Sequence, residues 1–252
     1  MLAPVEKVNG IYLKRNDLNV FCGCFGGKAE CAFNMMSKAP VKKFVTCGSR
    51  DSLQCEMVSQ MCDMLGYECH IFIPSGKDTK TTLRISKCET TTLHRVENGY
   101  TVVVNKRAED FARENNMTLI PFGMQSMTAV DIIANQVRNI PDDVTRVVVP
   151  VGGGITMCGV MNGLVRYNRT DVHVLGVITG KNPDKVIKMY EPWFNPIKYK
   201  LAPYKDVSPA KRYAMRVDCA VGHVLLDPVY EGKCYTFLNE GDLLWIVGYH
   251  EV

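Results

Sequence analysis

The sequence lacks any run of about 18 consecutive apolar residues, the length that a membrane-spanning helix needs. We therefore expect no membrane span. The opening "MLAPVEKVNG" lacks a basic stretch followed by an apolar core, so we expect no secretory signal and a cytoplasmic location. Long Gly/Ser or Pro linkers, low-complexity segments and repeats are absent too. The 252 residues are 46% apolar, enough for a full core in one α/β domain or in two small lobes.

Neither sign of charge dominates. Thirty Lys and Arg residues face 26 Asp and Glu residues, and the net charge of +4 is spread along the chain. Such a balance is typical of an ordinary solvated surface and gives only weak support for a nucleic-acid surface.

Clustered metal ligands are also missing. Of the eleven cysteines, only Cys22 and Cys24 form a close pair, and no second pair matches them, so we expect no metal site. Cys55, Cys62 and Cys69 recur every seven residues, on one helical face or just beyond its end. We interpret the cysteines as small, buried thiols in a reducing compartment.

What is present is an alternation of strand and helix patterns. "KKFVTCG" predicts a strand, "SLQCEMVSQMCDMLG" a helix and "ECHIFIP" another strand. Further along, "YTVVVN" predicts a strand and "KRAEDFARENN" a helix. The repeated alternation predicts a doubly wound α/β protein with open, mostly parallel, twisted sheets and flanking helices. Ligands of such folds bind beyond the carboxyl ends of the strands.

The glycine loop in "VVVPVGGGITMCGV" is the strongest local signal. An apolar strand ends in Gly152, Gly153 and Gly154, and we expect a helix to begin after Thr156. Backbone N–H groups and a helix N-terminus favour an anion, and the threonine adds a hydroxyl. The spacing is neither the dinucleotide pattern nor a P-loop, so it fits a single phosphate. The alternative is a tight turn whose glycines serve packing.

A second loop, "TCGSRDSLQCEM", follows a strand that ends at Gly48. Its hydroxyl and amide side chains, together with free N–H groups, could bind a carboxylate; they belong to Ser49, Ser52 and Gln54. The alternative is that one of the serines only caps the helix.

A third loop lies in "LLDPVYEGKCYTF". Asp-Pro forces an extended or turn conformation, which fixes Tyr230 and Glu231. A tyrosine and a carboxylate there can form an acid/base pair or belong to an ordinary surface turn. Tyr204 and Tyr213 lie upstream, and we interpret both as packing or surface residues.

One lysine stands directly after a glycine pair, in "CFGGKAECAF". Taken alone, Lys28 is a solvated helix start, a phosphate clamp or an amine bonded to an aldehyde cofactor. An amine, a phosphate cradle and a tyrosine/acid pair are together what pyridoxal phosphate needs.

On these residues the chain resembles the tryptophan-synthase-β-like (fold type II) pyridoxal-phosphate enzymes. The resemblance is greatest to the branch of 1-aminocyclopropane-1-carboxylate deaminase and D-cysteine desulfhydrase. The motifs that carry it are "YLKRNDL", "FGGK", "TCGSRDSLQ", "IPFGM", "VGGGIT" and "DPVYEGK". They occur in the family's order and span nearly the whole chain.

The resemblance implies a role for each candidate residue. Lys28 would be the Schiff-base lysine and proton shuttle, Tyr230 the catalytic tyrosine, and Glu231 the acid that faces the pyridine nitrogen. The cofactor phosphate would be bound by Gly152, Gly153, Gly154, Ile155 and Thr156. The substrate carboxylate would be bound by Ser49, Ser52 and Gln54.

The resemblance also implies a compact enzyme with a small lobe of about residues 41–125 and a large lobe of about residues 1–40 and 126–252. The expected assembly is a homodimer. The expected reaction is deaminase- or desulfhydrase-like lyase chemistry at the α-carbon of an amino acid.

Three positions differ from the family pattern and leave alternatives open. Leu53 replaces the asparagine that meets the cofactor's 3′-oxygen, Gly27 replaces an asparagine before the lysine, and Glu30 replaces a basic residue. One alternative is a phage enzyme of DNA hypermodification that decarboxylates or reworks an amino acid attached to thymine, and so contacts DNA. Another is a non-catalytic protein that has kept the fold.

Overall fold

The computed structural model describes residues 2–97 and 99–248, and the chain divides into two compact units. The first unit comprises Met1–Asn19, Phe25–Gly27 and Ser126–Val252, and the second comprises Val20–Cys24 and Lys28–Gln125. Residues 28–40, which we expected in the larger lobe, therefore fall in the second unit.

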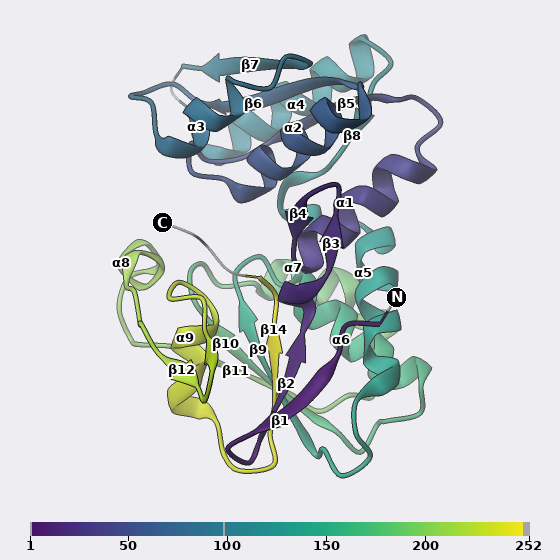
Figure 1. Ribbon diagram of the computed structural model, residues 1–252, viewed down its shortest axis with the longest axis vertical. Coiled ribbons are helices and arrows are strands. Elements are labelled where there is room, and N and C mark those ends of the chain that lie inside the picture. The colour runs from purple at the N-terminus through teal and green to yellow at the C-terminus, as the bar shows by residue number, and fades with distance from the viewer. Residues whose placement is uncertain (1, 98, 249–252) are drawn as a thin grey trace. The chain divides into compact units, whose positions relative to one another are not determined.

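The first unit contains a six-stranded sheet with the order β1-β2-β14-β9-β10-β11 (Figure 1). All neighbours run parallel except β1 and β2, which form an antiparallel pair. The strands are β1 (Val5–Val8), β2 (Ile11–Arg15), β14 (Leu243–Ile246), β9 (Arg146–Val151), β10 (His173–Ile178) and β11 (Tyr199–Pro203). The last strand in the sequence thus lies inside the sheet, between β2 and β9.

The two faces of this sheet are covered by different elements. On one face, Val148 and Leu244 pack with residues of β12 (Ala220–Val221), β13 (Val224–Leu225) and α9 (Glu231–Cys234). On the other face lies α6 (Ile155–Arg166), so close that a Cβ added to Gly176 would meet Met157 Sδ at 2.5 Å. The other elements are η1 (Asn16–Leu18), α5 (Met127–Asn135), η3 (Gln136–Asn139), α7 (Asp184–Tyr190), η4 (Glu191–Trp193), α8 (Pro209–Ala214) and η5 (Tyr235–Phe237).

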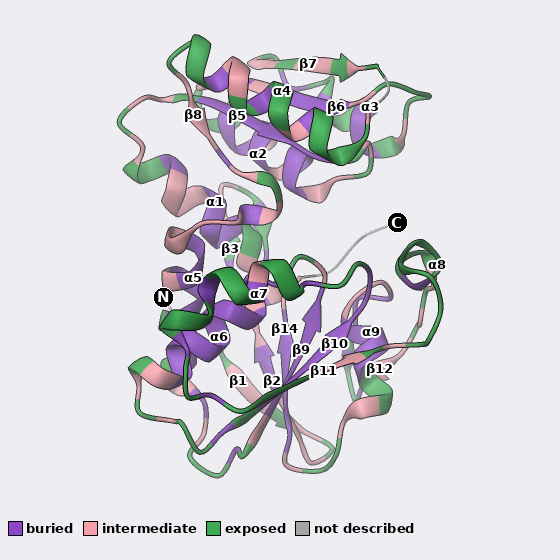
Figure 2. Ribbon diagram, turned by 180° about the vertical axis from the view of Figure 1, so that it is seen from behind, coloured by how far each residue is buried: buried purple, intermediate pink, exposed green. Residues whose placement is uncertain are grey.

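The second unit contains a four-stranded parallel sheet with the order β7-β6-β5-β8. Its strands are β7 (Thr91–Val96), β6 (Glu68–Pro74), β5 (Lys43–Cys47) and β8 (Thr118–Leu119). Helix α4 (Thr101–Glu114) covers one face, and α2 (Leu53–Leu65) with α3 (Lys80–Ile85) covers the other, which leaves the central strands buried (Figure 2). Two further elements of this unit are β3 (Val20–Phe21) and η2 (Phe122–Met124). The elements β4 (Cys24–Phe25) and α1 (Gly27–Lys38) each have one residue, Phe25 and Gly27, in the first unit.

One predicted element is wrong. The stretch "YTVVVN" is not a strand but the start of α4. Val104, Ala108 and Ala112 follow one another at intervals of four and pack together against β5 and β6, which is the spacing of a helix face. The valine run favours a strand locally, and packing on the sheet overrides that preference.

The fold class predicted from the sequence is confirmed: the protein is α/β, with mostly parallel sheets and flanking helices. Nine of the eleven cysteines are buried, and none forms a disulfide. Among the described residues, no helix combines the length and the apolar character that crossing a membrane requires.

Candidate active site

The glycine loop joins β9 to α6 in the first unit. The strand ends at Val151, and the helix begins at Ile155, one residue before Thr156, where we expected the loop to end. The first N–H groups of a helix have no acceptor within it. A Cβ added to Gly153 would meet no atom within 4 Å, so the loop borders open space there. The loop therefore offers N–H donors and room for an anion.

Tyr230 lies against this loop. A Cβ added to Gly152 would come within 3.1 Å of Tyr230 Cε1, so a larger residue at position 152 would press on the tyrosine ring. The Tyr230 backbone is held by Asp227, whose Oδ1 accepts the N–H groups of Val229 at 2.8 Å and Tyr230 at 2.9 Å. This Asx turn explains how "DPVY" fixes the tyrosine.

A second tyrosine meets Tyr230. The hydroxyl oxygens of Tyr213 and Tyr230 are 3.4 Å apart, and their rings form an edge-to-face pair with centroids 6.2 Å apart. Burial, and next the neighbouring Tyr213, raises the pKa of Tyr230 well above its ordinary value of 10.0. From the sequence we interpret Tyr213 only as a packing or surface residue, because no local motif marks it. Tyr204 packs against the core, which is one of the two roles that we left open for it.

Glu231 is the most unusual side chain of the site. It begins α9, is fully buried, and accepts the N–H of Val247 on Oε1 at 2.6 Å. Its other oxygen, Oε2, is buried and has no hydrogen-bond partner among the described residues. Burial, with a smaller contribution from Asp227, raises the pKa of Glu231 well above 4.5. The raised pKa favours the protonated carboxyl group, and within residues 2–97 and 99–248 no side chain or backbone group pairs with Oε2.

Val247 connects Glu231 with the residue that precedes Lys28. Its carbonyl accepts the N–H of Gly27 at 2.9 Å. Gly26 has φ +98°, and a Cβ there would lie 2.7 Å from the same carbonyl oxygen, so only glycine fits. Asn16 lies beside Gly27, and its Nδ2 is a second buried atom without a partner in the described part of the chain. Lys28 itself is exposed. It is the second residue of α1 and the first residue of that helix that belongs to the second unit.

The serines and the glutamine lie together in the second unit, where β5 leads into α2. Ser52 caps α2 by accepting the N–H of Cys55 on Oγ at 3.3 Å, while Ser49 is exposed. Gln54 Nε2 donates to Thr46 Oγ1 at 3.0 Å and to the Pro121 carbonyl at 2.8 Å. Both amide hydrogens of Gln54 are therefore used within the unit.

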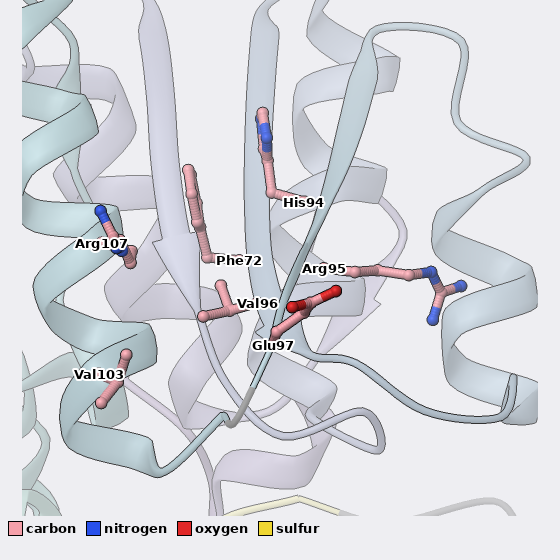
Figure 3. Close-up of a pocket in the computed structure, with 7 residues that line it drawn as sticks. All are labelled: Phe72, His94, Arg95, Val96, Glu97, Val103 and Arg107. Atoms are coloured by element: carbon pink, nitrogen blue, oxygen red, sulfur yellow. The ribbon is translucent and has the colours of Figure 1, made fainter.

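A cavity of about 370 Å³ also lies in the second unit (Figure 3). Phe72, His94, Val96 and Arg107 are among the residues that line it, and none of the residues predicted from the sequence does. Within residues 2–97 and 99–248, no group of His, Cys, Asp and Glu side chains is placed to hold a metal ion.

The family profile described as pyridoxal-phosphate dependent enzyme matches residues 2–221. The chain belongs to this family. Its cofactor is therefore pyridoxal 5′-phosphate, in agreement with the prediction from the sequence. No curated protein matches the sequence closely enough to count as a relative.

Solved structures agree with this assignment. A homologue of ACC deaminase is similar with a TM-score of 0.78 and 19% identity, over 98% of this chain and 89% of that one. Threonine deaminase isoform 2 from Solanum lycopersicum is similar with a TM-score of 0.67 and 16% identity, over 99% of this chain and 80% of that one. An L-serine ammonia-lyase from Rhizomucor miehei is similar with a TM-score of 0.65 and 18% identity, over 100% of this chain and 94% of that one. At these identities the likeness shows the fold, which is that of the fold type II pyridoxal-phosphate enzymes.

The residues of this chain fit the cofactor. Glu231 Oε2 is a buried polar atom with no partner among residues 2–97 and 99–248, as a residue that faces a ring nitrogen requires. The glycine loop borders open space that a side chain at position 153 would fill. Lys28 follows directly on Gly27, whose backbone is tied through Val247 to Glu231.

Proposed function

We propose that the protein is a pyridoxal-phosphate-dependent lyase of the deaminase or desulfhydrase type, acting at the α-carbon of an amino acid. The observation that carries the proposal is the buried Glu231, whose Oε2 has no partner among the described residues and which is tied through Val247 to the residue before Lys28.

Bound pyridoxal phosphate supplies an electron sink for bonds at the α-carbon. Lys28 Nζ holds the cofactor and carries a proton to or from the α-carbon. Glu231 keeps a proton at Oε2 for the ring nitrogen, because burial makes the ionised carboxylate costly until a cation faces it. This is the role that the sequence resemblance implied for both residues.

The phosphate is bound by N–H groups of the glycine loop and the start of α6, from Gly152 to Ile155, and by the hydroxyl of Thr156. Tyr230 lies beside this loop and stays protonated, since its pKa is raised. It therefore acts as a proton donor to the leaving group or to a carbanion rather than as a resting base.

The substrate carboxylate is bound by the hydroxyl groups of Ser49 and Ser52. Ser52 uses an oxygen lone pair to cap α2 and keeps its O–H free to donate. Gln54 stabilises the loop that carries the serines, because its amide hydrogens are bound to Thr46 and Pro121.

Covalent labelling tests the proposal. The protein is incubated with pyridoxal phosphate, reduced with borohydride and digested, and the modified residue is located by mass spectrometry. We expect the label on Lys28 and its loss in Lys28→Ala, while Lys38→Ala, at the exposed end of the same helix, keeps it. Label on another lysine in the wild-type protein would refute the role of Lys28.

The reaction type needs a second assay. Release of ammonia and a 2-oxo acid from free amino acids, with D-cysteine and 1-aminocyclopropane-1-carboxylate among them, supports the lyase proposal. If CO₂ is released, and only from amino-acid-modified DNA, the DNA-modification alternative replaces the lyase proposal. If the protein binds the cofactor but turns over no substrate, the non-catalytic alternative replaces it.

A further inference from the structure

Lys233 is a fully buried cation that the reaction does not use directly. It lies on α9, two residues after Glu231, and its Nζ donates to the carbonyls of Arg212 at 2.8 Å and Tyr213 at 3.1 Å. Both carbonyls belong to the last turn of α8, where helix carbonyls lack partners within the helix. Lys233 thus caps α8 from the side of α9.

A second cation fixes the same segment. Arg212 is also buried and donates to the carbonyls of Gly180, Lys205 and Val207, each at 2.9 Å. Burying two cations is costly, and here the cost is offset by hydrogen bonds to backbone carbonyls. The positions of α8 and of the loop before it are therefore determined by these two side chains.

Tyr213 is the residue whose placement depends on this arrangement. Its carbonyl is bound by Lys233, the Lys233 Nζ lies 5.9 Å from its ring centroid, and its Cδ2 lies 3.3 Å from a Cβ added to Gly180. Its hydroxyl meets that of Tyr230 and is reachable from solvent, because 48% of the residue is exposed.

We propose that Lys233 is a positioning residue that holds the Tyr213 hydroxyl against Tyr230, so that Tyr213 returns to Tyr230 the proton that Tyr230 gives up. The proton moves from Tyr213 Oη to Tyr230 Oη, and Tyr213 recovers one from water. The proposal rests on the proposed function in one respect, that Tyr230 is the proton donor.

The lysine is suited to this role by its environment. Burial lowers the pKa of Lys233 to about 8, so at neutral pH the side chain is still mostly the ammonium form with three donors. Two of these serve the carbonyls at the end of α8. An apolar side chain of similar length at position 233 would fill the space and remove the donor that both carbonyls share.

The test is a double-mutant cycle read by NMR. The protein is loaded with pyridoxal phosphate and labelled at the tyrosine ζ-carbon, and the Tyr230 resonance is compared in wild type, Tyr213→Phe, Lys233→Met and the double variant. Tyr213→Phe shifts the resonance because it removes the hydroxyl partner. We expect Lys233→Met to give at least half of that shift, and no further shift on the Tyr213→Phe background. Lys185→Met, at an exposed site on α7, should shift nothing.

A purely structural lysine gives a different result. If folded Lys233→Met is less stable but leaves the Tyr230 resonance in place, the proposal is refuted. Should Lys233→Met not fold, Lys233→Gln is used instead, because its side chain is one bond shorter than lysine and cannot reach both carbonyls as the ammonium does. A Tyr230 resonance that stays in place in folded Lys233→Gln refutes the proposal, and a shift toward that of Tyr213→Phe supports it. The borohydride labelling of Lys28 is measured on the same samples, so a failure of the proposed function is recognised separately.

Discussion

Glu231 and Val247 form a hydrogen bond of 2.6 Å that occupies one carboxyl oxygen of the glutamate, while the other is buried and has no partner in the part of the chain that the structure describes. Val247 at the same time accepts the N–H of Gly27, one residue before Lys28. Val247, the residue directly after β14, thus ties the proposed ring-nitrogen acid to the backbone that carries the proposed cofactor lysine.

Glu231 makes the stability of the cofactor-free protein depend on pH. Its folded-state pKa is raised above 4.5, so above that pH the unfolded chain loses a proton that the folded chain keeps. The free energy of unfolding then falls as pH rises, by about 1.4 kcal/mol per unit until the folded pKa is reached. Glu231→Gln lacks this dependence. In urea unfolding at pH 5, 6 and 7, the free energy of unfolding of Glu231→Gln should rise relative to that of wild type as pH increases. If the two free energies change with pH in parallel, the raised pKa is contradicted.

Alanine substitutions at the neighbouring Gly152 and Gly153 distinguish the effect on packing from the effect on phosphate binding. Gly152→Ala brings a Cβ to 3.1 Å from Tyr230 and should lower both stability and cofactor affinity. Gly153→Ala meets no protein atom within 4 Å, so it should leave stability within about 0.5 kcal/mol while weakening phosphate binding. Unfolding curves and equilibrium dialysis with pyridoxal phosphate check this. Equal affinity in Gly153→Ala and wild type would place the phosphate elsewhere.

Gly26 should tolerate alanine far less well than a comparable glycine. Both Gly26 and Gly66 have positive φ, at +98° and +67°, but only at Gly26 would a Cβ meet backbone, 2.7 Å from the Val247 carbonyl oxygen. Left-handed backbone costs alanine roughly 1–2 kcal/mol. We expect that loss for Gly66→Ala and a clearly larger one for Gly26→Ala in urea unfolding. If the two variants lose similar amounts of stability, the backbone near Val247 moves to make room for the alanine Cβ at no cost in free energy.

Ser52 and Ser49 differ in what they do for the fold. Ser52→Ala removes the cap of α2 and should cost about 1 kcal/mol of stability, whereas Ser49→Ala should cost little because the residue is exposed. If both serines bind the substrate carboxylate, both variants should raise KM. If neither variant raises KM and only Ser52→Ala loses stability, the serines do not bind the substrate carboxylate and Ser52 only caps α2.

The sequence predicted those features that local patterns encode. The helix α2, the strand β5 and the loop of Gly152 each follow from a regular run that ends in glycine, and β6 follows from an apolar run that ends at Pro74. The run "TVVVN" was mistaken for a strand, because three valines favour extended backbone and only packing on β5 and β6 shows the helical spacing of Val104. The membership of residues 28–40 in the second unit likewise depends on tertiary contacts.

Parts of the site were predictable and parts were not. Motifs named Tyr230 and Glu231, while the partner of Glu231 is Val247, which is 16 residues further along the chain and outside any motif. Tyr213 and Lys233 meet through the ends of two short helices, which no spacing in the sequence announces. The roles of Lys28 and of the serines stay predictions until the labelling and kinetic experiments are made.

The place of β14 has a consequence for biosynthesis. The strand is translated after every other element of its sheet, yet it lies between β2 and β9, so the ribosome must deliver Leu243–Ile246 before the interior of that sheet can close. Until then β2 and β9 expose unpaired edges, which are sites of aggregation. The four-stranded sheet is formed within residues 43–119 and has all its strands much earlier. A nascent chain stalled shortly before β14 should therefore hold a folded small sheet beside an open large one.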